Sequence, residues 1–255
     1  MQLIPGRPPG RPKGGPQTDP AGVHVRPEGS RTRRPPVWFF DLDDTLHDAS
    51  HAIFRAIDSR MTSYVERHLA VDRAEADRIR RHYWLRYGAT LLGLVRHHGV
   101  DAHHFLHETH DFEVVELLRA ERGLGRLFAR LPGRKVLLTN APARYASAVV
   151  RALAIHRHLG ARYSIETMRV HGTFRPKPSR SMLRHMLARE RVRRGGAVLV
   201  EDSAANLRAA RAAGFRTVLV TGHSRGRKQP FRAGYVGLRL RSVLELPRAR
   251  ARLRG

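Results

Sequence analysis

The second half of the chain alternates between short apolar runs and longer segments that suit helices. The apolar runs are KVLL, ARYSI, AVLV and TVLV, and helices are expected after the first three, near residues 143–155, 179–189 and 204–213. Such an alternation predicts a parallel sheet with helices on both faces. Residues 37–40 (VWFF) form an earlier run of β-branched and aromatic residues, which suits a strand buried on both faces. We therefore expect this run to be the first strand of the same sheet.

A helical pattern fills the region between the first strand and the others. From residue 51 to about residue 122, apolar residues such as Ile53, Ile57 and Met61 recur at spacings of three and four, with charged residues between them. The expected fold is an α/β core with an inserted helical cap. Residues 37–50 and 123–247 form the expected core, and residues 51–122 the cap.

Both ends of the chain are basic and poor in apolar periodicity. Residues 1–36 are rich in Pro, Gly and Arg and are predicted to be a disordered tail, and residues 248–255 (RARARLRG) are interpreted as a frayed C-terminal tail. No apolar run approaches the roughly 20 residues of a membrane span, and the N-terminal stretch lacks the apolar segment of a signal peptide. We therefore expect a cytoplasmic protein with no membrane partner, and the oligomeric state is left open.

The composition is strongly basic, but the charge is dispersed. The chain has 48 Lys and Arg against 22 Asp and Glu, a formal net charge of +26. Nearly all of the positive charge is arginine, because lysine occurs only at Lys13, Lys135, Lys177 and Lys228. No nucleic-acid-binding motif accompanies the arginines, so weak adhesion to phosphate backbones is expected rather than a specific nucleic acid partner. The lack of cysteine excludes disulfides and thiolate chemistry.

Candidate chemistry lies directly after the apolar runs, where ligands of open α/β sheets bind. Three acids in four positions follow the first strand, and carboxylates so close together predict a cation beside them. They are Asp41, Asp43 and Asp44, of which Asp44 is interpreted as structural. Further polar residues follow two later strands or precede a helix. They are Thr139, Asn140, Lys177, Glu201 and Asp202.

Each of these residues alone could cap a helix or make a turn, but together they would form a costly cluster unless a cation and an anionic ligand balanced them. Oxygen donors without cysteine favour Mg²⁺, so the pattern predicts a magnesium site for phosphate chemistry. Asp41 and Asp43, two residues apart, could point into one cavity, where one attacks phosphorus and the other shuttles a proton. Lys177 and Thr139 would then neutralise and hold the phosphoryl oxygens.

The segments DLDDTL, LLTN, KP and EDSAANL occur in this order and resemble the four motifs of the haloacid dehalogenase superfamily. The resemblance covers about residues 37–247. It implies a Rossmann-like core with a helical cap inserted after the first motif. It also implies a Mg²⁺-dependent phosphatase that acts on a small phosphorylated metabolite through an aspartyl phosphate.

Roles follow from this resemblance position by position. Asp41 resembles the nucleophile and is also expected to bind the metal. Asp43 resembles the acid that protonates the leaving oxygen and then activates water, with its main-chain carbonyl on the metal. Thr139, with Asn140 beside it, matches the phosphate-binding motif, and Lys177 matches the lysine that pairs with nucleophile and phosphate.

The fourth motif supplies the metal ligand. Asp202 matches the position that binds Mg²⁺, whereas Glu201 stands where many relatives have another aspartate. This leaves open whether Glu201 reaches the metal directly or through water, and we expect it to act from outside the ligand set.

The same resemblance also indicates which type of reaction to expect. Dehalogenases of the superfamily lack an acid at the position of Asp43, because a halide leaves without a proton, so phosphate chemistry is expected. Residues 83–108 (YWLRYGATLLGLVRHHGVDAHHFLHE) resemble the cap of pyrimidine 5′-nucleotidase-like members. The expected substrate is a pyrimidine nucleoside 5′-monophosphate or a similar small phosphomonoester. The alternatives are a sugar-phosphate phosphatase and a phosphomutase.

The cap also contains a group of histidines that could have another role. The six are His97, His98, His103, His104, His107 and His110. On a helix, His103 or His104 lies close enough to His107 to share a transition metal. The alternative is a solvated helix face in a histidine-rich chain, and no carboxylate-and-histidine set of fixed spacing favours zinc. Cap metal binding and nucleic acid binding are therefore the less favoured functions.

Overall fold

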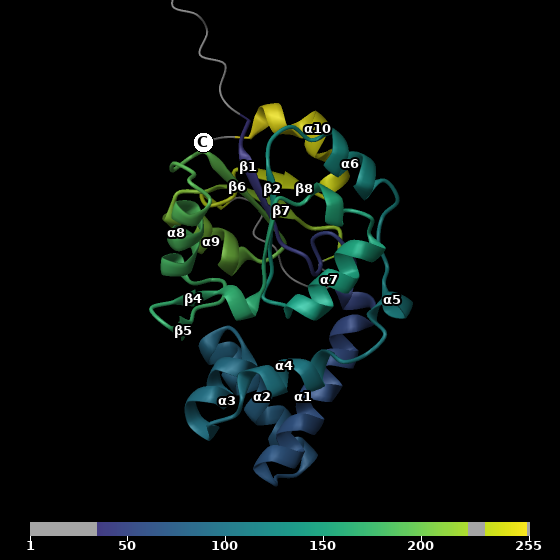
Figure 1. Cartoon of the computed structure of the whole chain (residues 1–255), viewed down its shortest axis with the longest axis vertical. Helices are drawn as coiled ribbons and strands as arrows, with labels where there is room; N and C mark the ends of the chain where they lie inside the picture. Colours follow the sequence, from purple (N-terminus) through teal and green to yellow (C-terminus); the bar gives the residue numbers. More distant parts are fainter. Residues whose placement is uncertain (1–34, 224–232, 254–255) are drawn as a thin grey trace, which may run out of the picture. The chain divides into compact units, whose positions relative to one another are not determined.

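A computed structural model describes residues 35–223 and 233–253 of the chain (Figure 1). The predicted N-terminal tail lies outside the described residues, apart from Pro35 and Pro36. Within the described part, no helix is long and apolar enough to cross a lipid bilayer.

Six parallel strands form the central sheet, which confirms the predicted α/β fold class. The strands lie in the order β3-β2-β1-β6-β7-β8. Their bounds are β1 Val37–Phe40, β2 Lys135–Leu138, β3 Ala161–Tyr163, β6 Ala197–Glu201, β7 Arg216–Val220 and β8 Leu238–Leu240. β1 lies between β2 and β6, with Phe39 opposite Val136 on one side and Leu199 on the other. Three strands were not expected from the sequence: β8, and the small antiparallel pair formed by β4 (Arg169–Val170) and β5 (Thr173–Phe174).

Helices cover both faces of the sheet, which is why β1 is apolar at every position (Figure 1). Successive strand residues point to opposite faces. Thus Phe40 packs against Phe128 with ring centroids 4.7 Å apart, and Phe39 packs against Phe215 with centroids 5.2 Å apart. The first face is covered by α6 (Leu124–Arg130), α7 (Ala143–Ala152) and α10 (Leu246–Ala249), and the second by α8 (Arg180–Arg189) and α9 (Ala204–Ala213).

The two helices of the second face begin where the sequence predicted. The Ser179 side chain accepts a hydrogen bond from the Met182 N–H, and Ser203 caps α9 in the same way. The helix predicted over residues 143–155 ends earlier, at Ala152, because Ala154 adopts a φ of 55° that ends the helical turn.

The predicted cap is helical throughout most of its length. Its helices are α1 (Ile53–Leu69), α2 (Arg73–Tyr87), α3 (Thr90–His98), α4 (Ala102–His110) and the short α5 (Val114–Leu117). Buried side chains including Tyr64, Leu94 and Phe105 form a separate cluster, to which Ile165 from outside the cap also belongs. Ile57 and Val114 belong instead to the cluster of the sheet's first face, so the change from one cluster to the other falls within α1 and before α5.

The interpretation of residues 248–255 as a frayed tail has to be corrected for residues 248–253. Ala249 ends α10 and is 1% exposed, and a 3-10 turn follows over Arg250–Arg252. Leu253 then packs against the first face of the sheet. Two apolar side chains among the arginines thus suffice to hold the segment on the core, because each removes apolar surface from water.

Candidate active site

The three central strands bring the predicted polar residues to one edge of the sheet. β1 is flanked by β2 and β6, so the residues that follow these strands are neighbours in space although far apart in sequence. The main chain keeps its sheet hydrogen bonds up to this edge. The N–H of Asp41 donates to the carbonyl of Val200 at 3.0 Å, and the N–H of Thr139 donates to that of Tyr163 at 2.9 Å.

Lys177 lies at the centre of this edge. Its Nζ donates to Oδ1 of Asp41 at 2.6 Å and to Oε2 of Glu201 at 2.8 Å, and the lysine side chain is 1% exposed. Burial by itself would lower the pKa of Lys177, but the charges of Asp41 and Glu201 raise it above its usual value. The buried amine is therefore held as a cation between two carboxylates.

Three buried carboxylates converge beside this lysine. One oxygen each of Asp41, Glu201 and Asp202 lies within 4.8 Å of the other two. Burial and the charge of Glu201 raise the pKa of Asp41 to about 7, although Lys177 opposes the rise. The set offers only hard oxygen donors, which fits Mg²⁺. Among the described residues it is the one such group of three or more acidic, histidine or cysteine side chains.

Two protein groups hold the carboxylate of Glu201. Glu201 accepts from Lys177 through Oε2 and from the N–H of Ser203 through Oε1 at 3.1 Å. Both oxygens of Glu201 thus have protein donors. Asp202 is 4% exposed.

Asn140 contacts the main chain of Lys177. Its Nδ2 donates to the Lys177 carbonyl and its Oδ1 accepts from the Lys177 N–H, both at 2.9 Å. This pair of hydrogen bonds fixes the loop that carries the lysine.

Thr139, beside Asn140 in sequence, is buried, with 1% of its surface exposed. Its Oγ1 accepts a hydrogen bond from the N–H of Ala141 at 3.1 Å, which leaves the hydroxyl hydrogen to donate elsewhere.

Asp43 is held by two residues that the sequence did not point to. The Oη of Tyr145 lies 2.6 Å from Oδ1 of Asp43, and the Nε2 of His47 lies 2.9 Å from the same oxygen. Burial would raise the pKa of Asp43, but the hydrogen bonds from His47 and Tyr145 hold it below its usual value. The only signal in the sequence was the i, i+4 spacing of Asp43 and His47.

Two further contacts shape the loop after β1. Thr45 Oγ1 donates to Oδ2 of Asp41 at 3.0 Å, so each oxygen of Asp41 has one donor. Asp44 is fully buried at a φ of 57°, a conformation that aspartate tolerates, and it accepts hydrogen bonds from the N–H and Oγ of Ser50. This agrees with the structural role expected for Asp44.

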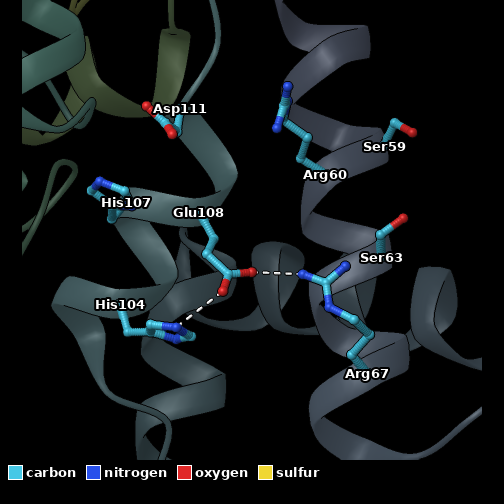
Figure 2. A pocket seen from close by; sticks show the side chains of 8 residues that line it. All are labelled: Ser59, Arg60, Ser63, Arg67, His104, His107, Glu108 and Asp111. Atoms are coloured by element: carbon cyan, nitrogen blue, oxygen red, sulfur yellow. Dashed lines mark hydrogen bonds and ion pairs between the residues drawn. The ribbon is translucent and has the colours of Figure 1, made fainter.

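The cap histidines bind neighbouring side chains. His104 and Arg67 both contact the carboxylate of Glu108, at 3.0 and 2.6 Å, in a pocket of about 570 Å³ between α1 and α4 (Figure 2). His107 also lines this pocket, and Figure 2 draws no contact between it and His104. Within residues 35–223 and 233–253, no histidine belongs to a set of potential metal ligands, so nothing in this part of the chain supports a cap metal site.

Comparisons with known proteins agree with this architecture. A family model described as a haloacid dehalogenase-like hydrolase matches residues 37–214. The solved L-2-haloacid dehalogenase of Xanthobacter autotrophicus is 15% identical over 86% of this chain and 100% of its own, with a TM-score of 0.52. A HAD phosphatase from Thermococcus onnurineus is 17% identical over 86% and 100%, with a TM-score of 0.54. YfnB from Bacillus subtilis, bound to magnesium, is 14% identical over 85% and 98%, with a TM-score of 0.53.

Proposed function

The chain belongs to the haloacid dehalogenase-like hydrolase family, and we propose that it is a Mg²⁺-dependent hydrolase of small phosphomonoesters. The observation that carries the proposal is the convergence of Asp41, Glu201 and Asp202 beside the buried ammonium of Lys177. When ionised, the three acids and one lysine leave two negative charges, which one divalent cation balances. An anionic substrate can enter such a site only if this charge is neutralised.

In the proposed mechanism, a carboxylate oxygen of Asp41 attacks phosphorus. The bond from phosphorus to the leaving oxygen breaks, and the leaving oxygen takes a proton from Asp43. Water then attacks the aspartyl phosphate and gives a proton back to Asp43, which releases phosphate and frees Asp41. The pKa of Asp43 is low in the free site, so we expect it to take up its proton when the anionic phosphate arrives beside it.

Other residues hold the reactants. Lys177 would lie between Asp41 and a phosphoryl oxygen and reduce the repulsion between the two anions. Thr139 would donate its hydroxyl to the phosphate, and Asn140 would fix the Lys177 main chain rather than meet the substrate through its side chain. Mg²⁺ held by Asp41, Asp202 and the Asp43 carbonyl would supply charge neutralisation and orientation when bound.

Asp43 favours phosphate transfer over dehalogenation. A halide leaves as a stable anion and needs no proton, whereas an alkoxide needs one. Asp43 sits two residues after the proposed nucleophile, and Tyr145 and His47 hold it there. Solved structures of the same fold include both a dehalogenase and a phosphatase, so the acid is what supports the phosphatase assignment.

For the substrate, we propose a pyrimidine nucleoside 5′-monophosphate, on the resemblance of residues 83–108 to the caps of pyrimidine 5′-nucleotidase-like members. One contact indicates that residues 83–108 lie near the proposed active site. Gly88, which ends α2 with a φ of 80°, lies so close to the lysine loop that a Cβ there would be 3.4 Å from Cδ of Pro178. Sugar phosphates, and a phosphomutase reaction, are the alternatives.

A substrate panel tests the proposal. Purified protein with Mg²⁺ would be assayed for phosphate release from UMP, CMP, AMP, GMP and several sugar phosphates, and for halide release from a 2-haloalkanoate. We expect Mg²⁺-dependent phosphate release, fastest with UMP or CMP. Equal rates on all esters would remove the nucleotidase assignment, and halide release without phosphate release would overturn the phosphatase assignment.

A further inference from the structure

We propose that Tyr145 and His47 are positioning residues that anchor Oδ1 of Asp43 and so assign proton transfer to Oδ2. The proposal rests on the phosphatase function above and deepens it. Neither residue touches substrate in this scheme, because both act through the carboxylate of Asp43.

The hydrogen bonds explain why the two carboxylate oxygens of Asp43 have different roles. Tyr145 Oη at 2.6 Å and His47 Nε2 at 2.9 Å meet the same oxygen, Oδ1. A carboxylate oxygen has two lone pairs in the plane of the group. When His47 carries its hydrogen on Nε2, the two donors leave Oδ1 no site for a proton. The proton that Asp43 carries must then be on Oδ2. Burial and the charge of Asp43 raise the pKa of Tyr145 well above its usual value, so the phenol keeps its hydrogen and donates.

Both anchors are buried. Tyr145 is 2% exposed on α7, and its ring meets the His110 ring edge-on with centroids 5.7 Å apart. His47 is fully buried, and no hydrogen bond partner of its Nδ1 lies among the described residues. The Asp43 side chain nevertheless keeps 17% of its surface exposed, so part of the carboxylate stays accessible to a substrate.

As the bond from Asp41 to phosphorus forms and the bond to the leaving oxygen breaks, the proton moves from Oδ2 of Asp43 to that oxygen. In the second half, water loses a proton to Oδ2 as its oxygen bonds to phosphorus and Asp41 leaves. Oδ1 stays hydrogen-bonded to Tyr145 and His47 throughout.

Leaving-group dependence distinguishes positioning from simple structural support. With Mg²⁺, kcat/KM would be measured for p-nitrophenyl phosphate, whose leaving group needs little help from an acid, and for phenyl phosphate, whose leaving group needs more. The value of kcat/KM reports the steps up to the phosphoenzyme, which include protonation of the leaving group. A misplaced Asp43 carboxyl should therefore lower kcat/KM most with phenyl phosphate. For Tyr145→Phe we expect a loss of roughly 10- to 100-fold with phenyl phosphate and less than about 3-fold with p-nitrophenyl phosphate.

Two controls accompany this variant. Tyr163→Phe removes another buried phenol that donates to a carboxylate, that of Glu190, and should leave the ratio of the two substrates unchanged. His47→Gln keeps an N–H near the position of Nε2 and should stay near wild type, whereas His47→Leu should show the leaving-group-dependent loss. The His47 pair decides the question if Tyr145→Phe does not fold.

Each outcome has a definite meaning. Equal losses on the two esters, or no loss, in Tyr145→Phe and His47→Leu would overturn the positioning role and leave the phosphatase function standing. A wild-type protein that releases phosphate with Mg²⁺ neither from these two esters nor from the nucleotides and sugar phosphates named above would overturn the phosphatase function, and the positioning proposal with it.

Discussion

The Nζ atom of Lys177 lies 2.6 Å from Oδ1 of Asp41, although 136 residues separate the two in the sequence. A buried ammonium that is also bound to Glu201 compensates part of the negative charge of the site before any ligand arrives. The same contact places the amine beside the atom proposed to attack phosphorus. Charge balance and the proposed attack on phosphorus thus depend on one geometry.

Removing the nucleophile should abolish activity without unfolding the protein. In Asp41→Asn the amide is a poor nucleophile and a weaker metal ligand, so we expect phosphatase activity to fall by at least roughly 10³-fold. Circular dichroism should show a native melting transition. Turnover near that of the wild type in carefully purified variant would refute a covalent mechanism through Asp41.

Magnesium dependence should separate Asp202 from Glu201. Asp202→Asn would remove a proposed direct ligand, so the Mg²⁺ concentration for half-maximal activity should rise more than in Glu201→Gln. For the Glu201 variant, which loses a partner of Lys177, we expect an effect of roughly 10- to 100-fold. Activity titrations with Mg²⁺ measure both values. If the order of the two variants is reversed, the ligand assignment is wrong.

Lys177 should not be replaceable by arginine. A guanidinium keeps the positive charge but is planar and larger, so it cannot lie between Asp41 and Glu201 as the buried ammonium does. We expect Lys177→Arg to lose most of its kcat and to gain little from excess Mg²⁺. Lys135→Arg, at the start of β2, is the matched control and should retain activity. Full rescue of Lys177→Arg by Mg²⁺ would mean that the lysine supplies only generic charge.

The stability of the protein should depend on pH through His110. Burial lowers the pKa of His110 to about 4, below the value of about 6.5 expected in the unfolded chain. The unfolded state therefore binds the proton more readily, and the stabilising effect of a neutral His110 is lost as the pH falls from about 6.5 toward 4. Between pH 7 and pH 5, the free energy of unfolding should fall by roughly 2 kcal/mol more in the wild type than in His110→Asn. Urea melts at both pH values measure this, and parallel changes in the two proteins would contradict it.

Gly93 should be required for the packing of α2 against α3. A Cβ at this position would lie 2.1 Å from Cγ of Tyr83, so Gly93→Ala must push the tyrosine or the helix aside. We expect a loss of roughly 1 to 3 kcal/mol in the free energy of unfolding. Gly125→Ala on α6 is the matched control, because its Cβ would meet nothing closer than the Ala154 carbonyl at 3.6 Å. Thermal melts that show equal effects for the two variants would argue against the close approach.

Local pattern was enough to predict the core strands and the helices after them. β1 begins and ends at the predicted residues, and α9 occupies the whole of its predicted range. The reason is that an apolar run or a helical period is a property of neighbouring residues. Segments without such a pattern could not be predicted this way. β8 is a single arginine between two leucines, and the C-terminal segment is held by Ala249 and Leu253 among arginines.

The sequence by itself determined which residue types stand at the strand ends, and hence the oxygen-rich character of the site around Asp41 and Asp202. The tertiary structure alone decided how these side chains are divided among their partners. Asn140 binds the main chain of Lys177, and Tyr145 reaches Asp43 from 102 residues away. Such contacts depend on how α7 packs against the sheet, and no periodicity along the chain encodes the distance between atoms that only folding brings together.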